Sequence, residues 1–382
     1  MLPVAATTFQ QASAGQLLAL FAAFLIPILL MAVFFHYLPD ITRRDIFFAV
    51  TVEPLFRDRP ESRQTVRRFR TAAWIHSLIG LAVALTAIAF GNPLISLAGI
   101  GWQLTGVTHA FLRARRKILP HSISPAVRAE TLLAPRSSDG IIHVLLQIGP
   151  FAVLGASALY LETQWDRIPA RFPVHWSIDG RPNGWSARST GGVYGPLLIA
   201  FGICVMLEIL SYAIMHWTRQ ICAGGPEAKS EARFRNLQTA ILTAVQYVIA
   251  LAFGSVPFLA LRANPNASPA IGPLLLVIFV PVAVLFVILI RTGQGGANLA
   301  RGGSESDILD QNRPVGDGTP DRCWRAGMFY VNGNDPAILV EKRFGIGYTL
   351  NFGRPAAWVL MAVILALVML PLLIGFVSTQ PR

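Results

Sequence analysis

The chain has 382 residues, of which 53% are hydrophobic and only 14% are charged. Soluble domains carry about 25% charged residues, so this composition excludes an ordinary soluble enzyme. A mean hydropathy of +0.53 also indicates a membrane protein. The apolar residues gather in runs of about 20, the length of helix that crosses a bilayer, and not in the short alternating segments of an outer-membrane barrel. The predicted fold class is therefore an all-α polytopic membrane protein.

Eight apolar segments are long enough to be transmembrane helices. The second and third are separated only by Gly91, Asn92 and Pro93, a turn that makes them an antiparallel pair. In chain order, we predict spanning helices at residues 16–37, 72–90, 94–112, 141–161, 194–216, 237–261, 270–290 and 356–376.

The net charge of +12 raises the question of nucleic-acid binding. The basic residues, however, gather in alternate loops between the predicted helices. Because Lys and Arg are enriched in cytoplasmic loops, we predict a plasma-membrane protein with these loops in the cytoplasm and both termini outside. The charge is then a topology signal, with some attraction to anionic membrane lipid, and no nucleic-acid partner is expected. The basic residues predicted to lie outside are Arg167, Arg171, Arg181, Arg188, Arg262 and Arg382.

The predicted helices divide the chain into six regions. Residues 1–140 form an N-terminal membrane region with a basic cytoplasmic arm, 40–71, whose second half is predicted to be an amphipathic helix at the lipid headgroups. A run rich in Gly, Ser, Asp and Asn predicts a flexible linker at 292–321. The other regions are a helix pair with the loop 162–193 at 141–216, two helices at 217–291, a small cytoplasmic β-rich module at 322–355, and the last helix with the C-terminus at 356–382.

The loop 162–193 contains the densest motif of the chain. Its centre reads Pro-Val-His-Trp-Ser-Ile-Asp-Gly-Arg-Pro-Asn-Gly-Trp, from Pro173 to Trp185. The Asp-Gly and Asn-Gly pairs predict turns, and tryptophans settle at membrane interfaces. In one interpretation the loop binds an extracytoplasmic peptide or small ligand, or titrates with external pH; in the other, His175 only hydrogen-bonds the backbone and holds the loop closed. The candidate ligand-binding residues are His175, Trp176, Asp179, Gly180, Arg181 and Trp185.

The same motif resembles a bacterial membrane family. Its Pro-x-His-aromatic start at Pro173 and its Gly-x-Pro continuation at Gly180 are similar to the core of the domain of unknown function 1648. That family includes the SdpI-like immunity proteins, so the resemblance implies a membrane protein in which some relatives confer immunity. The segment 324–353 is similar to a small module of unknown function that is common near the end of such proteins.

Glu208 is the clearest ionisable residue inside a predicted span. A charge at the centre of a spanning helix costs roughly 2.5–3.5 kcal/mol, so Glu208 predicts a paired group, a proton carrier or a cation ligand. His143 and His216 fall near the predicted cytoplasmic ends of their helices. One hypothesis joins Glu208, His143 and His216 in a shared intramembrane polar site; the other assigns these histidines no function.

Three classes of function are open at this point. The favoured one is a non-enzymatic sensor, immunity-like or regulatory protein that acts through the loop 162–193 and signals to a cytoplasmic regulatory protein. The alternative is a secondary transporter or an ion- or proton-coupled permease that uses Glu208. An enzyme is least favoured, because no catalytic triad, carboxylate pair or metal-binding spacing is present. The three cysteines have no CxxC spacing, and we expect no cofactor and no metal.

Overall fold

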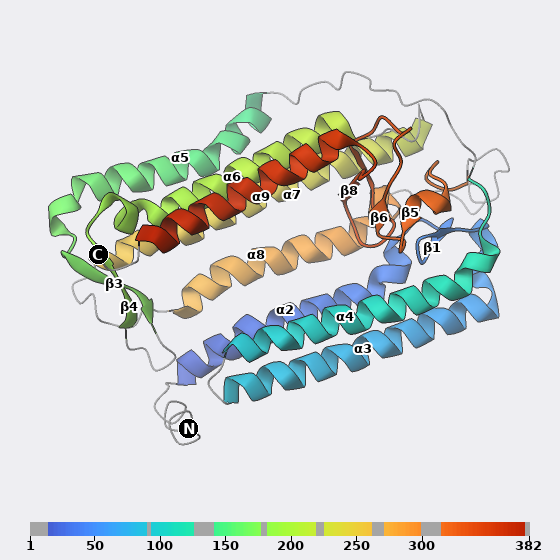
Figure 1. Cartoon of the computed structure of the whole chain (residues 1–382), viewed down its shortest axis with the longest axis horizontal. Helices are drawn as coiled ribbons and strands as arrows, with labels where there is room; N and C mark the ends of the chain where they lie inside the picture. The colour runs from blue at the N-terminus through green and yellow to red at the C-terminus, as the bar shows by residue number, and fades with distance from the viewer. Residues whose placement is uncertain are drawn as a thin grey trace.

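The computed structural model describes residues 14–89, 93–125, 141–176, 182–218, 225–261, 271–298 and 315–378. Within these ranges, eight α-helices run side by side along an elongated body, and small β units lie at its two ends (Figure 1). One end carries strands β3 (Arg171–Trp176) and β4 (Pro182–Ala187), and we call it the hairpin end. The opposite end, which carries the C-terminal strands, is called the module end.

Each of the eight described helices overlaps one predicted span. Six of them contain described segments long and apolar enough to cross a membrane, namely α2, α3, α5, α6, α7 and α8. These segments support a multi-pass membrane protein, and spanning by α4 and α9 stays a prediction. The bounds are α2 (Ala14–Ile41), α3 (Pro60–Ala89), α4 (Pro93–Ile118), α5 (Ile141–Thr163), α6 (Thr190–Trp217), α7 (Gly225–Ser255), α8 (Ile271–Thr292) and α9 (Pro355–Ser378).

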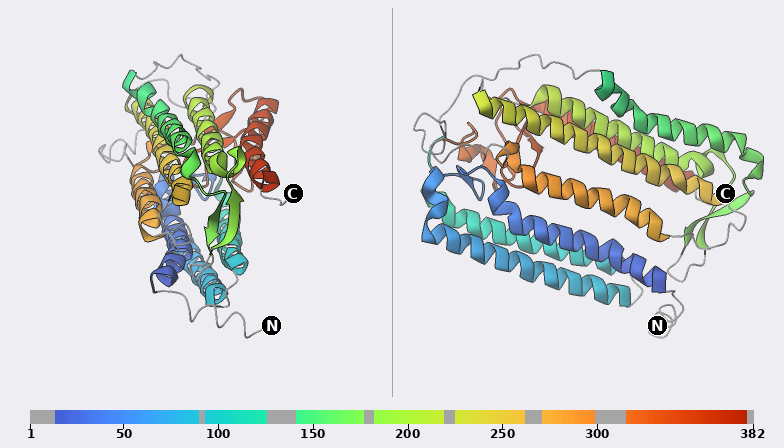
Figure 2. Two further views of the ribbon diagram at one scale, coloured as in Figure 1. Left: turned by 90° about the vertical axis from the view of Figure 1, so that its left-hand side faces the viewer. Right: turned by 180° about the vertical axis from the view of Figure 1, so that it is seen from behind.

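The helices form two groups with α8 between them (Figure 2). Helices α2, α3 and α4 pack together on one side, and α5, α6, α7 and α9 pack on the other, while α8 contacts both α2 and α7. Helices α3 and α4 lie backbone to backbone, since a Cβ added to Gly99 would lie 2.3 Å from the carbonyl oxygen of Gly80. Small residues at such positions let two helix backbones approach closely.

Helix α3 corrects the predicted boundary at residue 71. The predicted amphipathic helix and the second span form one continuous helix, because neither Pro nor Gly interrupts residues 61–79 and Pro60 suits a first helical position. The preceding arm folds into a two-stranded hairpin, β1 (Ile46–Phe47) and β2 (Val50–Thr51), followed by a 3₁₀ turn, Pro54–Asp58. Phe47 and Phe48 are buried with residues of α3 and α4, so the arm packs against the module end of the helices.

The C-terminal module contains four short strands in two antiparallel pairs. Strand β5 (Trp324–Arg325) pairs with β6 (Phe329–Tyr330), and β7 (Leu339–Glu341) pairs with β8 (Tyr348–Leu350). Tyr330 is completely buried and packs on Trp324. The module therefore has a small core of its own beside the start of α9.

The ordered module is longer than predicted. Residues 292–298 and 315–321 pack against the rest of the chain, so the prediction of a flexible linker is wrong for these two stretches; residues 299–314 lie outside the described residues. The physical reason is that their polar side chains find buried partners. The Gln294 amide, for example, donates to the carbonyl of Gly347 at 3.0 Å and accepts from its N–H at 2.8 Å.

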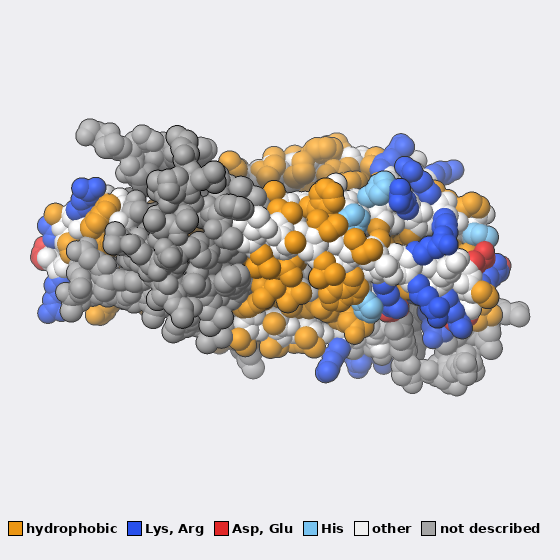
Figure 3. All heavy atoms as spheres, turned by 90° about the horizontal axis from the view of Figure 1, so that it is seen from below, with side chains coloured by type: hydrophobic (Ala, Val, Ile, Leu, Met, Phe, Trp, Pro, Cys, Tyr) orange, Lys and Arg blue, Asp and Glu red, His pale blue; other side chains and the backbone are white. Residues whose placement is uncertain are grey.

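Basic side chains gather near the module end of the described surface. Figure 3 shows many Lys and Arg side chains at that end, next to a hydrophobic region over the middle of the body. The first residue of α2 and the last residue of α9 both lie at the opposite end, as Figure 1 shows.

Candidate functional site

The β3–β4 hairpin is anchored at its base by apolar side chains. Ile168 and Phe172 are buried in a cluster with Leu161 of α5 and with Val193 and Leu197 of α6. Ser189 caps α6 by accepting a hydrogen bond from the N–H of Gly192, which fixes the direction in which the helix leaves the hairpin. The hairpin therefore projects from a rigid base at the end of α5 and α6.

Two arginines hold the polar surface of the hairpin. Arg188 directs Nη1 towards the carbonyl oxygens of Trp165, Asp166 and Ile168, at 3.2–3.4 Å, and so closes the connection between α5 and β3. The guanidinium carbon of Arg171 lies 5.4 Å from the centre of the Trp185 ring, a cation–π contact across the two strands. Both Arg171 and Trp185 are exposed, so this pair is open to a ligand.

The structure brings half of the predicted ligand-binding residues into this hairpin. His175 and Trp176 belong to β3, where the backbone of His175 pairs with Gly184 across an irregularity in the register, and Trp185 belongs to β4. Asp179, Gly180 and Arg181 lie outside the described residues. Sequence reasoning missed the strands themselves, although the alternation of Phe172, Val174 and Trp176 is the signal that could have found them.

Helix α6 links the hairpin to the module. It runs without a break from Thr190 to Trp217, and directly after it Thr218 forms a parallel β-bridge with Leu339 of β7. Near this bridge, Ile214 is buried together with Leu339 and with Leu360 of α9. The two β units at opposite ends of the body are thus joined by one helix.

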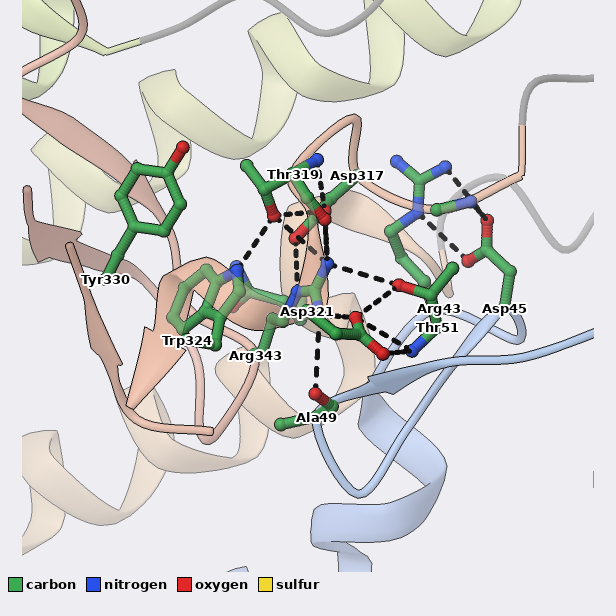
Figure 4. Close-up of polar contacts among 12 residues, drawn as sticks. Arg43, Asp45, Ala49, Thr51, Asp317, Thr319, Asp321, Trp324, Tyr330 and Arg343 are labelled. Atoms are coloured by element: carbon green, nitrogen blue, oxygen red, sulfur yellow. Dashed lines mark hydrogen bonds and ion pairs between the residues drawn. The ribbon is translucent and has the colours of Figure 1, made fainter. Parts of the chain in front are cut away.

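A buried polar network connects the module to the arm (Figure 4). At its centre, Arg343 donates two hydrogen bonds of 2.7 Å to the carboxylate of Asp317 and also pairs with Asp321. Its Nη2 further donates to the carbonyl of Thr319 at 2.6 Å and to the hydroxyl of Thr51 at 3.2 Å. We call these five residues the Arg343 network. Burial alone would lower the pKa of the Arg343 guanidinium, but Asp317 and Asp321 hold it above its ordinary value.

Asp321 extends the Arg343 network into the arm. Its carboxylate accepts hydrogen bonds from the N–H and the hydroxyl of Thr51, the latter at 2.8 Å, and from the hydroxyl of Ser122. Beside it, Asp45 pairs with Arg43 at 3.3 Å and accepts from the N–H of Gly316 at 2.7 Å. Burial alone would raise the pKa of Asp45, but Arg43 and the Gly316 N–H bring it below its ordinary value.

Sequence reasoning did not predict the Arg343 network. Thr51 and Asp321 are 270 positions apart in the chain, and no spacing rule relates them. Isolated charges in loops are usually solvated, so nothing in the local pattern marks Arg343 or Asp317 as buried.

Glu208 belongs to α6, and its carboxylate contacts the buried side-chain amide of Gln246 in α7. The Nε2 of Gln246 donates to the carboxylate of Glu208 at 3.3 Å and to the carbonyl of Cys204 at 3.1 Å. His216 is exposed two turns further along α6, where it stacks on Tyr212, and the side chain of His143 is outside the described part of the chain. Among the described residues, no group of three His, Cys, Asp or Glu is placed to hold a metal ion.

Two segments of the chain match known families. Residues 152–200 match the model described as "Domain of unknown function (DUF1648)". This match spans the end of α5, the hairpin and the start of α6, and it confirms the resemblance inferred from the loop motif. Residues 334–358 match "Family of unknown function (DUF5808)", which confirms the resemblance of the module to a small unit of unknown function. No curated protein and no solved structure matches the chain.

Proposed function

We propose that this protein is a non-enzymatic membrane sensor of regulatory or immunity type. In this proposal the β3–β4 hairpin binds a ligand outside the cell and the C-terminal module responds in the cytoplasm. The supporting observation is helix α6, which begins at the hairpin cap Ser189 and ends at the Thr218–Leu339 bridge to the module. A shift of the hairpin base is carried along this helix because packed helices move as rigid elements.

The proposed orientation rests on charge. Basic side chains gather towards the module end in Figure 3, and the positive-inside rule associates such an end with the cytoplasm. The hairpin end then faces the outside of the plasma membrane. If α4 and α9 also span, eight crossings leave both chain ends on the hairpin side.

The exposed chemistry of the hairpin favours a peptide or a small aromatic ligand. The Arg171–Trp185 pair offers a flat aromatic face beside a guanidinium, and Val174 of the same strand as Arg171 is also exposed. Aromatic and arginine side chains are the commonest hot spots of binding surfaces. The resemblance to a family in which some relatives confer immunity is in keeping with a ligand that comes from outside the cell.

The coupling can be tested with a surrogate ligand. A nanobody selected against the hairpin of the purified protein is bound to the protein in lipid nanodiscs, and hydrogen exchange of strands β7 and β8 is measured. We expect binding to change exchange in both strands. Ile214→Ala, which thins the contact between α6 and Leu339, should reduce the change, whereas Leu198→Ala, an exposed position of the same helix, should preserve it.

Two results would contradict the proposal. One is a nanobody that labels only permeabilised cells, because the hairpin would then lie inside. The other is saturating binding that leaves the module's exchange unchanged.

A second candidate function is an ion-coupled permease. It is favoured by the position of Glu208 inside the α6–α7 contact, since intramembrane carboxylates commonly mark ion or proton paths. Ion flux into liposomes that contain the purified protein, and loss of that flux in Glu208→Gln, would select this candidate over a sensor.

A further inference from the structure

A row of polar side chains lines the contact between α6 and α7. On α6, Cys204, Glu208 and Ser211 recur at intervals of four and three residues and therefore share one face of the helix. Because Gln246 of α7 bonds to both Cys204 and Glu208, this face points at α7. On α7, Gln246 shares its own face with the buried Thr239 and Thr243.

Two buried oxygens in this row have no hydrogen-bond partner among the described residues. They are Oε1 of Gln246 and the hydroxyl oxygen of Ser211. Gln246 is completely buried and Ser211 is 1% exposed. A buried polar atom without a partner costs free energy, roughly 1–3 kcal/mol, so such atoms commonly meet a water or an ion.

The carboxylate of Glu208 favours a cation over a water molecule. An amide oxygen and a carboxylate can only accept hydrogen bonds, so a donating water would satisfy them, but oxygen atoms of this kind are also the ligands of hard cations. When Glu208 is ionised inside a membrane, one positive charge balances its single negative charge. A divalent ion would leave an excess charge and usually needs more carboxylates.

Along the α6–α7 contact, the described polar side chains continue towards the module end but not towards the hairpin end. Towards the module end it continues along α7 through Thr243 and Thr239 to the buried Arg235. Towards the hairpin end, the same face of α6 carries Ala200 and Leu197, which belong to an apolar cluster.

We propose that Glu208, Gln246 and Ser211 form a binding site for one monovalent cation, for which sodium is the ion to test. Glu208 supplies the charge, and Oε1 of Gln246 and the Ser211 hydroxyl supply neutral ligands. The site is independent of the proposed sensor function, because it binds the cation whether or not the hairpin signals. It contains the Glu208 that the permease candidate uses, so a failure of sodium binding would count against a sodium-coupled permease as well.

The test measures equilibrium binding of radioactive sodium to the full chain in nanodiscs, in a choline buffer. We expect saturable binding near one ion per chain and a saturable rise in the melting temperature that choline does not reproduce. Glu208→Gln should abolish both effects. Glu61→Gln, which makes the same change at an exposed position at the start of α3, should retain both.

A milder variant guards against misfolding. Ser211→Ala removes one neutral ligand and should weaken sodium affinity about tenfold while leaving the charge in place. The proposal fails if the wild-type chain binds no sodium saturably, if Glu208→Gln binds it as the wild type does, or if Ser211→Ala leaves the affinity unchanged. Failure here leaves the hairpin experiment unaffected.

Discussion

Replacing Arg343 by Met should release the C-terminal module from the arm. The Arg343 side chain is 1% exposed and that of its partner Asp317 is 6% exposed. Loss of the guanidinium leaves the Asp317 carboxylate buried without its cation. Removing one partner of a buried ion pair costs about 3–5 kcal/mol. We expect the lower end of this range, because Asp321, the other carboxylate, keeps its bonds to Thr51 and Ser122.

Hydrogen exchange measures this cost locally. A loss of about 3 kcal/mol corresponds to more than a hundredfold faster exchange, since about 1.4 kcal/mol is a factor of ten. The effect should appear in peptides covering β1–β2 and β7–β8 of the protein in nanodiscs. Arg322→Met is the matched control. Because Arg322 is exposed in the same module, the amide hydrogens of this variant should exchange as fast as those of the wild type.

A double variant tests the reasoning itself. In Arg343→Met with Asp317→Asn the buried charge is gone, so exchange should be slower than in Arg343→Met alone. Wild-type exchange in Arg343→Met would show that the network contributes nothing to docking. Equal exchange in the single and double variants would show that the cost does not come from an uncompensated carboxylate.

Three further predictions follow from packing and protonation. Gly99→Ala should destabilise the α3–α4 contact by about 1–3 kcal/mol in thermal unfolding, because its Cβ meets backbone, whereas Gly101→Ala in the same helix meets nothing within 4 Å and should be silent. The pKa of Asp45 is lowered in the folded protein, so the ionised carboxylate stabilises the fold fully above about pH 4, and this stabilisation is lost as pH falls through the folded pKa. Pepsin cleavage of residues 315–321 should rise as this happens. The Asp45→Asn variant should not show this pH dependence. Burial lowers the pKa of Lys342, so the free energy of unfolding should increase as pH rises through that lowered pKa and should level off near about pH 10.4. If the Lys342→Met variant still shows this increase, Lys342 is not its cause.

The helical body could be predicted from the sequence because each helix has a long apolar run. The predicted span 141–161, for example, becomes α5 at Ile141–Thr163. The ends of helices were harder to predict where no change from apolar to polar residues marks them. The arginines before residue 71 suggested a separate surface helix, yet α3 passes through them because a helix can carry charges along one part and apolar residues along the next.

The candidate site was predictable only where its residues are close in sequence. The hairpin motif from Pro173 to Trp185 could be found because its turn residues and aromatic side chains lie within one loop. The partner of Glu208 could not, because Gln246 is one of many amides in apolar helices and only the packing of α6 on α7 selects it. Arg343 is the extreme case, because its burial is favourable only when the fold places Asp317, Asp321 and Thr51 around it.

The turn of the β1–β2 hairpin shows why docking of the module controls the arm. Phe48 and Ala49 both have positive φ values, of 46° and 61°, a conformation that costs non-glycine residues about 1–2 kcal/mol each. The Ala49 carbonyl accepts hydrogen bonds from Arg115 of α4 and, at 3.3 Å, from Arg343. Two buried cations thus offset the strain of the turn, and one of them belongs to the module. When Arg343 leaves, the turn keeps its strain and loses one of the two cations that bond to it, so the arm should relax together with the module.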